Sequence, residues 1–206
     1  AYTTQLVTLL LLALYMGRLN GNLAAEKEEQ ILRDLIAVPD LCQKIFDHVD
    51  DIKGLCDAFK NAEDVFFIGR SMDYGLAMEG SLKLKEISYI HAESYAGGEL
   101  KHGTLSLIEK GIPVIALATQ KDVEEKMISN IKEVKARDAY VIGVVQEGDT
   151  EVGKTVDSLI QVPQSDNFVV TIMAIIPLQM LAYYIAVSRG NDVDKPRNLA
   201  KSVTVE

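Results

Sequence analysis

The sequence has 206 residues, and its 30 acidic side chains outnumber its 21 lysines and arginines, which leaves a formal charge of −9. Hydrophobic residues make up 48% and charged residues 25%, proportions that are typical of a globular protein and argue against disorder. The acidic excess also argues against a nucleic acid partner, because phosphates require clustered lysines and arginines.

Residues 1–19 predict a helix that is apolar on every side. Its apolar run, Leu6–Met16, is shorter than the roughly 20 residues that a membrane crossing needs, and no basic segment precedes it. We therefore expect no membrane span and no signal peptide. A helix that is apolar all round needs neighbours all round, so we expect this helix to be buried inside something larger. Cys42 and Cys56 lack zinc-site spacing and indicate reduced thiols in a cytoplasmic protein.

Short helices are predicted over residues 23–37, 41–49 and 52–59, with Pro39 opening the second. Apolar runs at 64–69, 112–118, 140–145 and 158–162 then predict buried strands, and helices are predicted over 74–89, 123–136 and 168–188. Residues 90–111 are expected to form a long connection. Strands that alternate with helices favour an α/β fold, a three-layer sandwich with a parallel sheet, from about residue 50 to residue 190.

Ligands of such sheets bind beyond the carboxyl ends of the strands, which directs attention to the loops 69–74, 118–123 and 145–154. The first of these could bind an anion or simply turn the chain. In the third, residues 148–155 match the phosphate-binding P-loop pattern. A P-loop must open a helix, whereas this segment leads into a short apolar run that ends at Pro163 and carries acidic residues that would repel phosphate. We therefore predict a surface turn.

The densest polar group on the apolar scaffold consists of Glu79, Lys83 and Glu86, whose spacing places them on one helix face. A carboxylate beside an ammonium group can act as a general base, although the same spacing is also typical of a solvated ion-pair face. His102 lies among glycines and is a candidate proton shuttle or a surface histidine. No histidine or cysteine spacing predicts a metal site. Arg197 and Lys201 make the end of the chain locally basic, which would suit an anionic substrate.

Three segments together resemble the glucosamine-6-phosphate synthases, the isomerising glutamine–fructose-6-phosphate aminotransferases. They are Lys-Leu-Lys-Glu-Ile-Ser-Tyr-Ile-His-Ala-Glu over residues 83–93, Gly-Glu-Leu-Lys-His-Gly over 98–103, and Pro-Arg-Asn-Leu-Ala-Lys-Ser-Val-Thr-Val-Glu over 196–206. The resemblance covers essentially the whole chain. It implies a flavodoxin-like sugar-isomerase (SIS) fold divided as follows: 1–20, the last helix of an absent first SIS subdomain; 21–49, connecting helices; 50–190, the second SIS subdomain; 191–206, a tail over the sugar site.

The resemblance also implies roles for individual residues. Glu86 matches the base that moves a proton between C1 and C2 of the sugar, and His102 matches the ring-opening histidine, which the neighbouring subunit supplies. Lys83 would contact sugar hydroxyls, and Lys201 would meet the open-chain carbonyl. Ala200 would lend a backbone contact and Arg197 would seat the tail. Thr104 departs from the proline that the family usually has there, which leaves the turn beside His102 less rigid.

The implied activity is the synthesis of glucosamine 6-phosphate from fructose 6-phosphate and glutamine-derived ammonia, the first step of hexosamine biosynthesis. The implied partners are the sugar phosphate and a second copy of the chain, with no cofactor and no metal. The glutaminase domain and the first SIS subdomain, which holds the phosphate-binding loop, are not in this sequence, so we expect the chain alone to be inactive. The alternative is a SIS module that binds a sugar phosphate without turnover.

Overall fold

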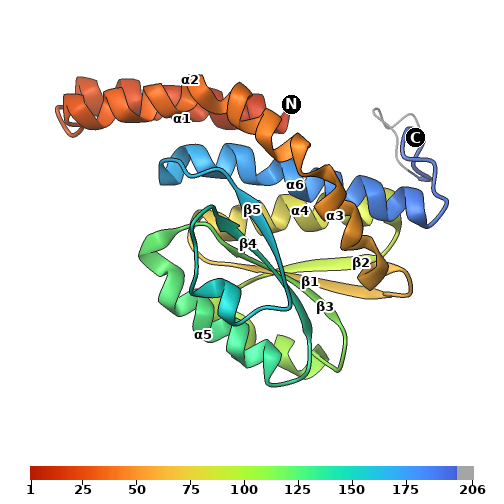
Figure 1. Ribbon diagram of the computed structural model, residues 1–206. Helices are drawn as coiled ribbons and strands as arrows, with labels where there is room; N and C mark the ends of the chain where they lie inside the picture. Colours follow the sequence, from red (N-terminus) through yellow and green to blue (C-terminus); the bar gives the residue numbers. More distant parts are fainter. Residues whose placement is uncertain (199–206) are drawn as a thin grey trace, which may run out of the picture.

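The centre of the molecule is one parallel sheet with the strand order β2-β1-β3-β4-β5 (Figure 1). The structure, a computed structural model, describes residues 1–198. The strands are β1 Asp64–Gly69, β2 His91–Ala96, β3 Pro113–Ala118, β4 Tyr140–Gln146 and β5 Ser158–Val162. This arrangement confirms the predicted α/β sandwich.

Alternate residues of the central strands divide the core into two layers, because successive strand side chains point to opposite faces. Phe67 and Ile115 face the helices α4, Met72–Ser88, and α6, Asn167–Ser188. Phe66 and Val114 face the helix α5, Glu124–Lys135. The short 3-10 turns beside the strands are η2 Gly97–His102, η3 Thr104–Leu107, η4 Lys121–Val123 and η5 Val152–Lys154.

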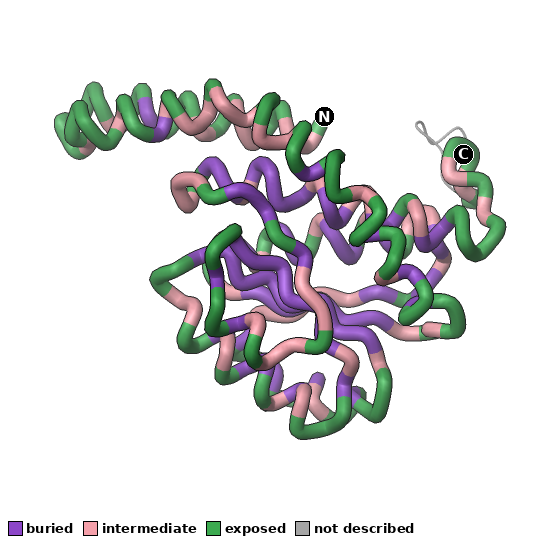
Figure 2. Tube along the Cα trace, viewed as in Figure 1, coloured by how far each residue is buried: buried purple, intermediate pink, exposed green. Residues whose placement is uncertain are grey.

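The amino-terminal part consists of helices that lie over α6 (Figure 1). They are α1 Tyr2–Leu19, α2 Ala25–Asp47, α3 Val49–Gly54 and the 3-10 turn η1 Cys56–Phe59. Helix α1 is largely exposed in this chain (Figure 2). Leu14 is its one buried residue, and Leu9 and Leu19 are 61% and 66% exposed. Its burial inside something larger stays a prediction. Within this chain α1 contacts α2 and α6, and Leu14 packs there with Ile31 and Val169.

Three elements differ from the expectation. The predicted helix over 52–59 is divided between the end of α3 and the 3-10 turn η1. A single helix, α2, replaces the predicted pair and runs through Pro39. Strand β2 lies within the predicted connection 90–111, at the edge of the sheet and paired with β1. An edge strand has a neighbouring strand on one side only. The sequence of β2, His-Ala-Glu-Ser-Tyr-Ala, is accordingly polar and lacks the apolar run of a central strand. The P-loop pattern forms a turn and the short η5, and strand β5 follows as predicted.

Helix α6 is the one helix of the described part that is long and apolar enough to cross a membrane. In this fold it is a core helix, since its buried residues pack against α4 and the sheet.

Candidate functional site

The acid–lysine group predicted on one helix face assembles on the second half of α4. Lys83 Nζ lies 2.7 Å from Glu86 Oε2 and 3.6 Å from Glu79 Oε1. The side chains of Lys83 and Glu86 keep 31% and 28% of their exposure, so this is a half-buried cluster rather than a fully solvated ion-pair face. Ion pairs that lose part of their water are stronger and better fixed than exposed ones.

The two acidic neighbours of Lys83 shift the pKa of its ammonium group. Burial acts to lower the pKa of the Lys83 ammonium, but its hydrogen bond to Glu86 and the charges of Glu79 and Glu86 outweigh that effect, and the pKa is raised overall. Lys83 therefore stays positively charged and holds the Glu86 carboxylate in place by a charge-assisted hydrogen bond.

Glu86 does not lie at the carboxyl edge of the sheet, where the strand pattern directed attention. Helix α4 leaves the carboxyl end of β1 and runs back, so its last turn lies near the start of β2, where His91 pairs with Asp64 at the start of β1. The candidate base is thus presented at the amino edge.

A surface cavity of about 520 Å³ lies beside the last turn of α4. Its lining includes Glu86, Tyr89 and Arg197. The Arg197 guanidinium carbon stacks 4.1 Å from the centre of the Tyr89 ring, and the Arg197 backbone N–H donates to the Tyr89 hydroxyl at 2.9 Å. Asn191 donates to the carbonyls of Ile87 and Ser88 at 3.1 Å each. The residues after α6 therefore return toward Glu86, and Arg197 lines the same cavity. Ala200 and Lys201 lie outside the described residues.

Tyr89 is a contact that sequence reasoning missed. It ends α4 in the left-handed conformation, with a φ of 63°. Glycine is the usual residue at such a position, because a side chain there is strained. Here the Tyr89 side chain contacts Arg197 through its ring and its hydroxyl group. A tyrosine directly after a helix carries no signal for this in the sequence, because the contact joins residues 108 positions apart.

His102 lies apart from Glu86 in the same chain. It ends η2, its side chain is 75% exposed, and its Nε2 atom is 3.9 Å from Glu99 Oε2. Its neighbours place it on the α5 side of the sheet: Leu100 belongs to the α5 core layer, and Lys101 pairs with Glu133 of α5 at 3.1 Å. Since α4 packs on the opposite face, one chain does not bring the two candidate residues together.

A second feature missed in the sequence is a buried polar network at the carboxyl edge. Asp73, which is 1% exposed, accepts hydrogen bonds from the Thr119 backbone N–H at 2.7 Å and from Thr119 Oγ1 at 2.6 Å. Burial raises the pKa of the Asp73 carboxyl to about 6, although hydrogen bonds from Thr119 and Gln120 oppose the rise. The network continues to Gln146, whose Nε2 atom donates to the Thr119 carbonyl at 2.7 Å.

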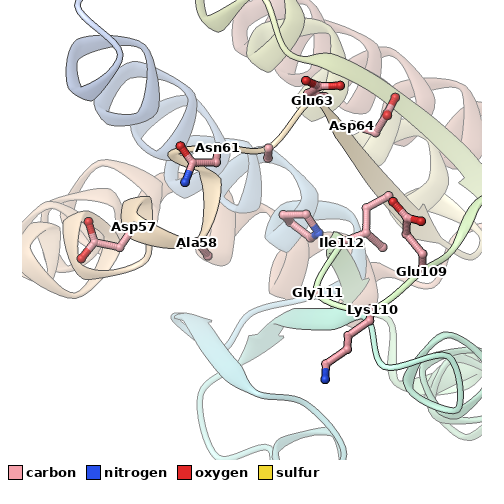
Figure 3. Close-up of a pocket in the computed structure, with 11 residues that line it drawn as sticks. Asp57, Ala58, Asn61, Glu63, Asp64, Glu109, Lys110, Gly111 and Ile112 are labelled. Atoms are coloured by element: carbon pink, nitrogen blue, oxygen red, sulfur yellow. The ribbon is translucent and has the colours of Figure 1, made fainter.

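A further cavity of about 410 Å³ lies at the amino edge, between the starts of β1 and β3 (Figure 3). It is rich in carboxylates, including Glu63, Asp64 and Glu109, and the Lys110 side chain extends away from them (Figure 3). Glu86 and His102 do not line it. Among the residues that the structure describes, no group of three or more histidine, cysteine or acidic side chains could hold a metal ion.

Comparison with known proteins identifies the fold and the relatives. Residues 58–189 match the SIS domain family. Over its whole length the chain is 52% identical to the glutamine--fructose-6-phosphate aminotransferase [isomerizing] of Caldanaerobacter subterraneus subsp. tengcongensis and 50% identical to that of Symbiobacterium thermophilum. It spans 34% of the length of each of these relatives.

Among solved structures, the C-terminal domain of glucosamine-fructose-6-phosphate aminotransferase from Francisella tularensis superposes with a TM-score of 0.88 at 34% identity. The match covers 94% of this chain and 55% of that one. The family match, the sequence relatives and the structure agree, and the chain belongs to the SIS domain family.

Proposed function

We propose that this chain is the second isomerase half of a glucosamine-6-phosphate synthase, which converts fructose 6-phosphate and glutamine-derived ammonia into glucosamine 6-phosphate. The observation that carries the proposal is the half-buried Lys83–Glu86 pair, 2.7 Å apart, beside the cavity that Arg197 also lines. The match of the whole of this chain to 34% of relatives named glutamine--fructose-6-phosphate aminotransferase [isomerizing] supports it.

In the proposed reaction, Glu86 acts on the imine that ammonia forms at C2 of the open-chain sugar. The Glu86 carboxylate removes a proton from C1, the C1–H electron pair forms the C1=C2 bond, and the imine nitrogen takes up a proton. The C1 hydroxyl then loses its proton to become the aldehyde, and Glu86 returns the first proton to C2. The net change is an isomerisation that needs no cofactor.

The other predicted residues take supporting roles in this proposal. Lys83 contacts sugar hydroxyls while it orients Glu86, and His102 of a second copy opens the sugar ring. Lys201 meets the open-chain carbonyl, and Arg197 and the Ala200 backbone seat the tail that carries it. Because Glu86 and His102 lie on different sides of one sheet, we expect the single chain to be inactive.

The partners follow from the same proposal. The relatives are about three times as long as this chain, and the exposed apolar residues Leu9, Leu12 and Leu19 of α1 would pack against a first SIS subdomain. A glutaminase domain would supply ammonia.

We also propose a cytoplasmic location, because Cys42 and Cys56 are both free.

The test uses a chimera in which this chain replaces the matching third of the Caldanaerobacter relative. Glu86→Gln keeps the size and the hydrogen bond to Lys83 but removes the base, so glucosamine 6-phosphate formation should fall at least about 100-fold while ammonia release from glutamine persists. The matched control is Glu125→Gln, which removes an exposed carboxylate of α5. Unchanged synthesis in Glu86→Gln would contradict the assignment. An unsubstituted chimera that folds and releases ammonia but makes no glucosamine 6-phosphate would favour the non-catalytic module.

A further inference from the structure

The strand order of this sheet places its topological switch point between the carboxyl ends of β1 and β3. The chain leaves β1 toward the α4 face and leaves β3 toward the α5 face, so the two loops diverge. The β1–β3 ladder ends at Ile68–Ala116, whereas the neighbouring β3–β4 ladder continues to Ala118–Val145. Open α/β sheets bind their ligands at this switch point.

In this chain the buried carboxyl group of Asp73 lies at the switch point. The turn after β1 is tight: a side chain on Gly69 would place its Cβ 2.4 Å from the Asp73 carbonyl oxygen, and Ser71 adopts a φ of 54°. This turn sets the first turn of α4 against the end of β1. From there the Asp73 side chain reaches Thr119, the residue directly after β3, and both of its oxygens accept hydrogen bonds.

The Asp73 carboxyl group accepts hydrogen bonds from two groups of Thr119. A backbone N–H and a hydroxyl of Thr119 point at the two oxygens, at 2.7 and 2.6 Å. Thr119 is itself fixed, because Gln146 Nε2 donates to its carbonyl and Gln120 Nε2 lies 3.2 Å from its hydroxyl oxygen. Donors held in place in this way need no reorganisation to bind a carboxyl group that replaces that of Asp73.

The cationic side chains that follow β1 and β3, Arg70 and Lys121, bond to groups other than Asp73. Arg70 Nε donates to Asn130 at 2.8 Å. Lys121 Nζ pairs with Glu124 at 2.7 Å and with Asp149 at 3.0 Å. Asp73 is therefore held by uncharged donors, and a replacement anion would meet the same donors.

We propose that the Asp73 carboxyl group fills a carboxyl-binding site at the β1–β3 switch point, and that this site takes a small free carboxylate once the Asp73 carboxyl group is removed. The physical reason is that a buried N–H and a buried hydroxyl without an acceptor are costly, so the emptied site favours any carboxylate that fits. In the native chain the Asp73 carboxyl group already accepts the hydrogen bonds of both Thr119 donors.

The experiment measures the melting temperature of Asp73→Ala in sodium formate and in sodium chloride of equal ionic strength. Formate is the carboxylate that the substitution removes. At formate concentrations ten times its Kd, the Tm of Asp73→Ala should rise by about 3–5 °C over chloride. The unsubstituted chain and the near-isosteric Asp73→Asn should show no such difference, and adding Thr119→Val to Asp73→Ala should remove most of it.

Two results would overturn the proposal. One is a folded Asp73→Ala whose Tm is the same in formate and chloride, and the other is an equal formate effect in the unsubstituted chain. Should Asp73→Ala not fold in chloride, refolding in formate becomes the readout. Recovery of the folded state in formate alone then supports the proposal, and failure in both salts contradicts it.

Discussion

At the scale of single residues, Asp73 makes the stability of the fold depend on pH. Its pKa is about 6 in the folded chain and has an ordinary value of 3.8, so the folded state binds the proton more tightly than the unfolded state. The stability that this proton contributes is complete below pH 3.8 and is lost as the pH rises through 6. Between pH 4.5 and pH 7.5 the loss amounts to about 2 kcal/mol.

The measurement is urea unfolding of the unsubstituted chain and of the Asp73→Asn variant at both pH values. Asparagine does not titrate, so the free energy of unfolding of the variant, relative to that of the unsubstituted chain, should improve by about 2 kcal/mol from pH 4.5 to pH 7.5. The exposed Asp40→Asn provides the matched control for loss of one charge. A difference between the unsubstituted chain and Asp73→Asn that stays constant with pH would show that the buried carboxyl titrates normally.

Residues of the site were predictable where the spacing along one helix decided their contact. Lys83 and Glu86 are three positions apart, and a helix brings such residues together whatever surrounds it. The contacts of Asp73 with Thr119 and of Tyr89 with Arg197 span 46 and 108 positions. They depend on how β1, β3 and the end of α6 meet, which no local pattern encodes.

At the scale of elements, α4 offers two glycines with opposite expectations. Gly75 is exposed and a Cβ there would meet nothing within 4 Å, so Gly75→Ala should stabilise the chain by about 0.5–1 kcal/mol through helix propensity. At Gly80 a Cβ would lie 2.8 Å from Leu178 Cδ1 and 3.0 Å from Phe67 Cε1. Overpacking against α6 and the sheet should exceed the propensity gain, so Gly80→Ala should cost about 1 kcal/mol.

Denaturant unfolding of the two variants at one pH checks this pair, and each serves as the control for the other. The prediction fails if both substitutions stabilise, because α4 would then have room to move away from α6. Equal destabilisation by Gly75→Ala and Gly80→Ala would also contradict the prediction, since a Cβ at Gly75 has no neighbour that could clash.

The elements that sequence patterns predicted are those with a buried apolar run or an amphipathic period. Strands β1 and β5 match their predicted bounds, and α4, α5 and α6 begin and end within two residues of theirs. Strand β2 was not predicted because its partner, β1, lies on one side only and its polar side chains follow from that edge position. Helix α2 continues through Pro39 where local preference would end it, because Ile31 and Ile45, on either side of the proline, are both buried in tertiary contacts.

At the scale of the whole molecule, the placement of Glu86 and His102 on different sides of the sheet distinguishes two ways to build a site. A site built within one chain would need Glu86 and His102 on the same face of the sheet, and they lie on opposite faces. If a two-fold symmetric dimer is formed, each site can combine Glu86 of one copy with His102 of the other. The second arrangement is part of the proposed function, and it has a consequence that subunit mixing can measure.

In the chimeric enzyme described above, Glu86→Gln and His102→Asn should each abolish synthesis. When the two inactive proteins are unfolded together and reassembled at equal concentration, half of the dimers should be mixed, and each mixed dimer has one site with both residues intact. Synthesis should therefore return to about a quarter of the unsubstituted level, because two-fold assembly pairs the subunits statistically. A mixture that stays inactive would mean that both residues serve the same chain, since a site built within one subunit always carries one of the two substitutions.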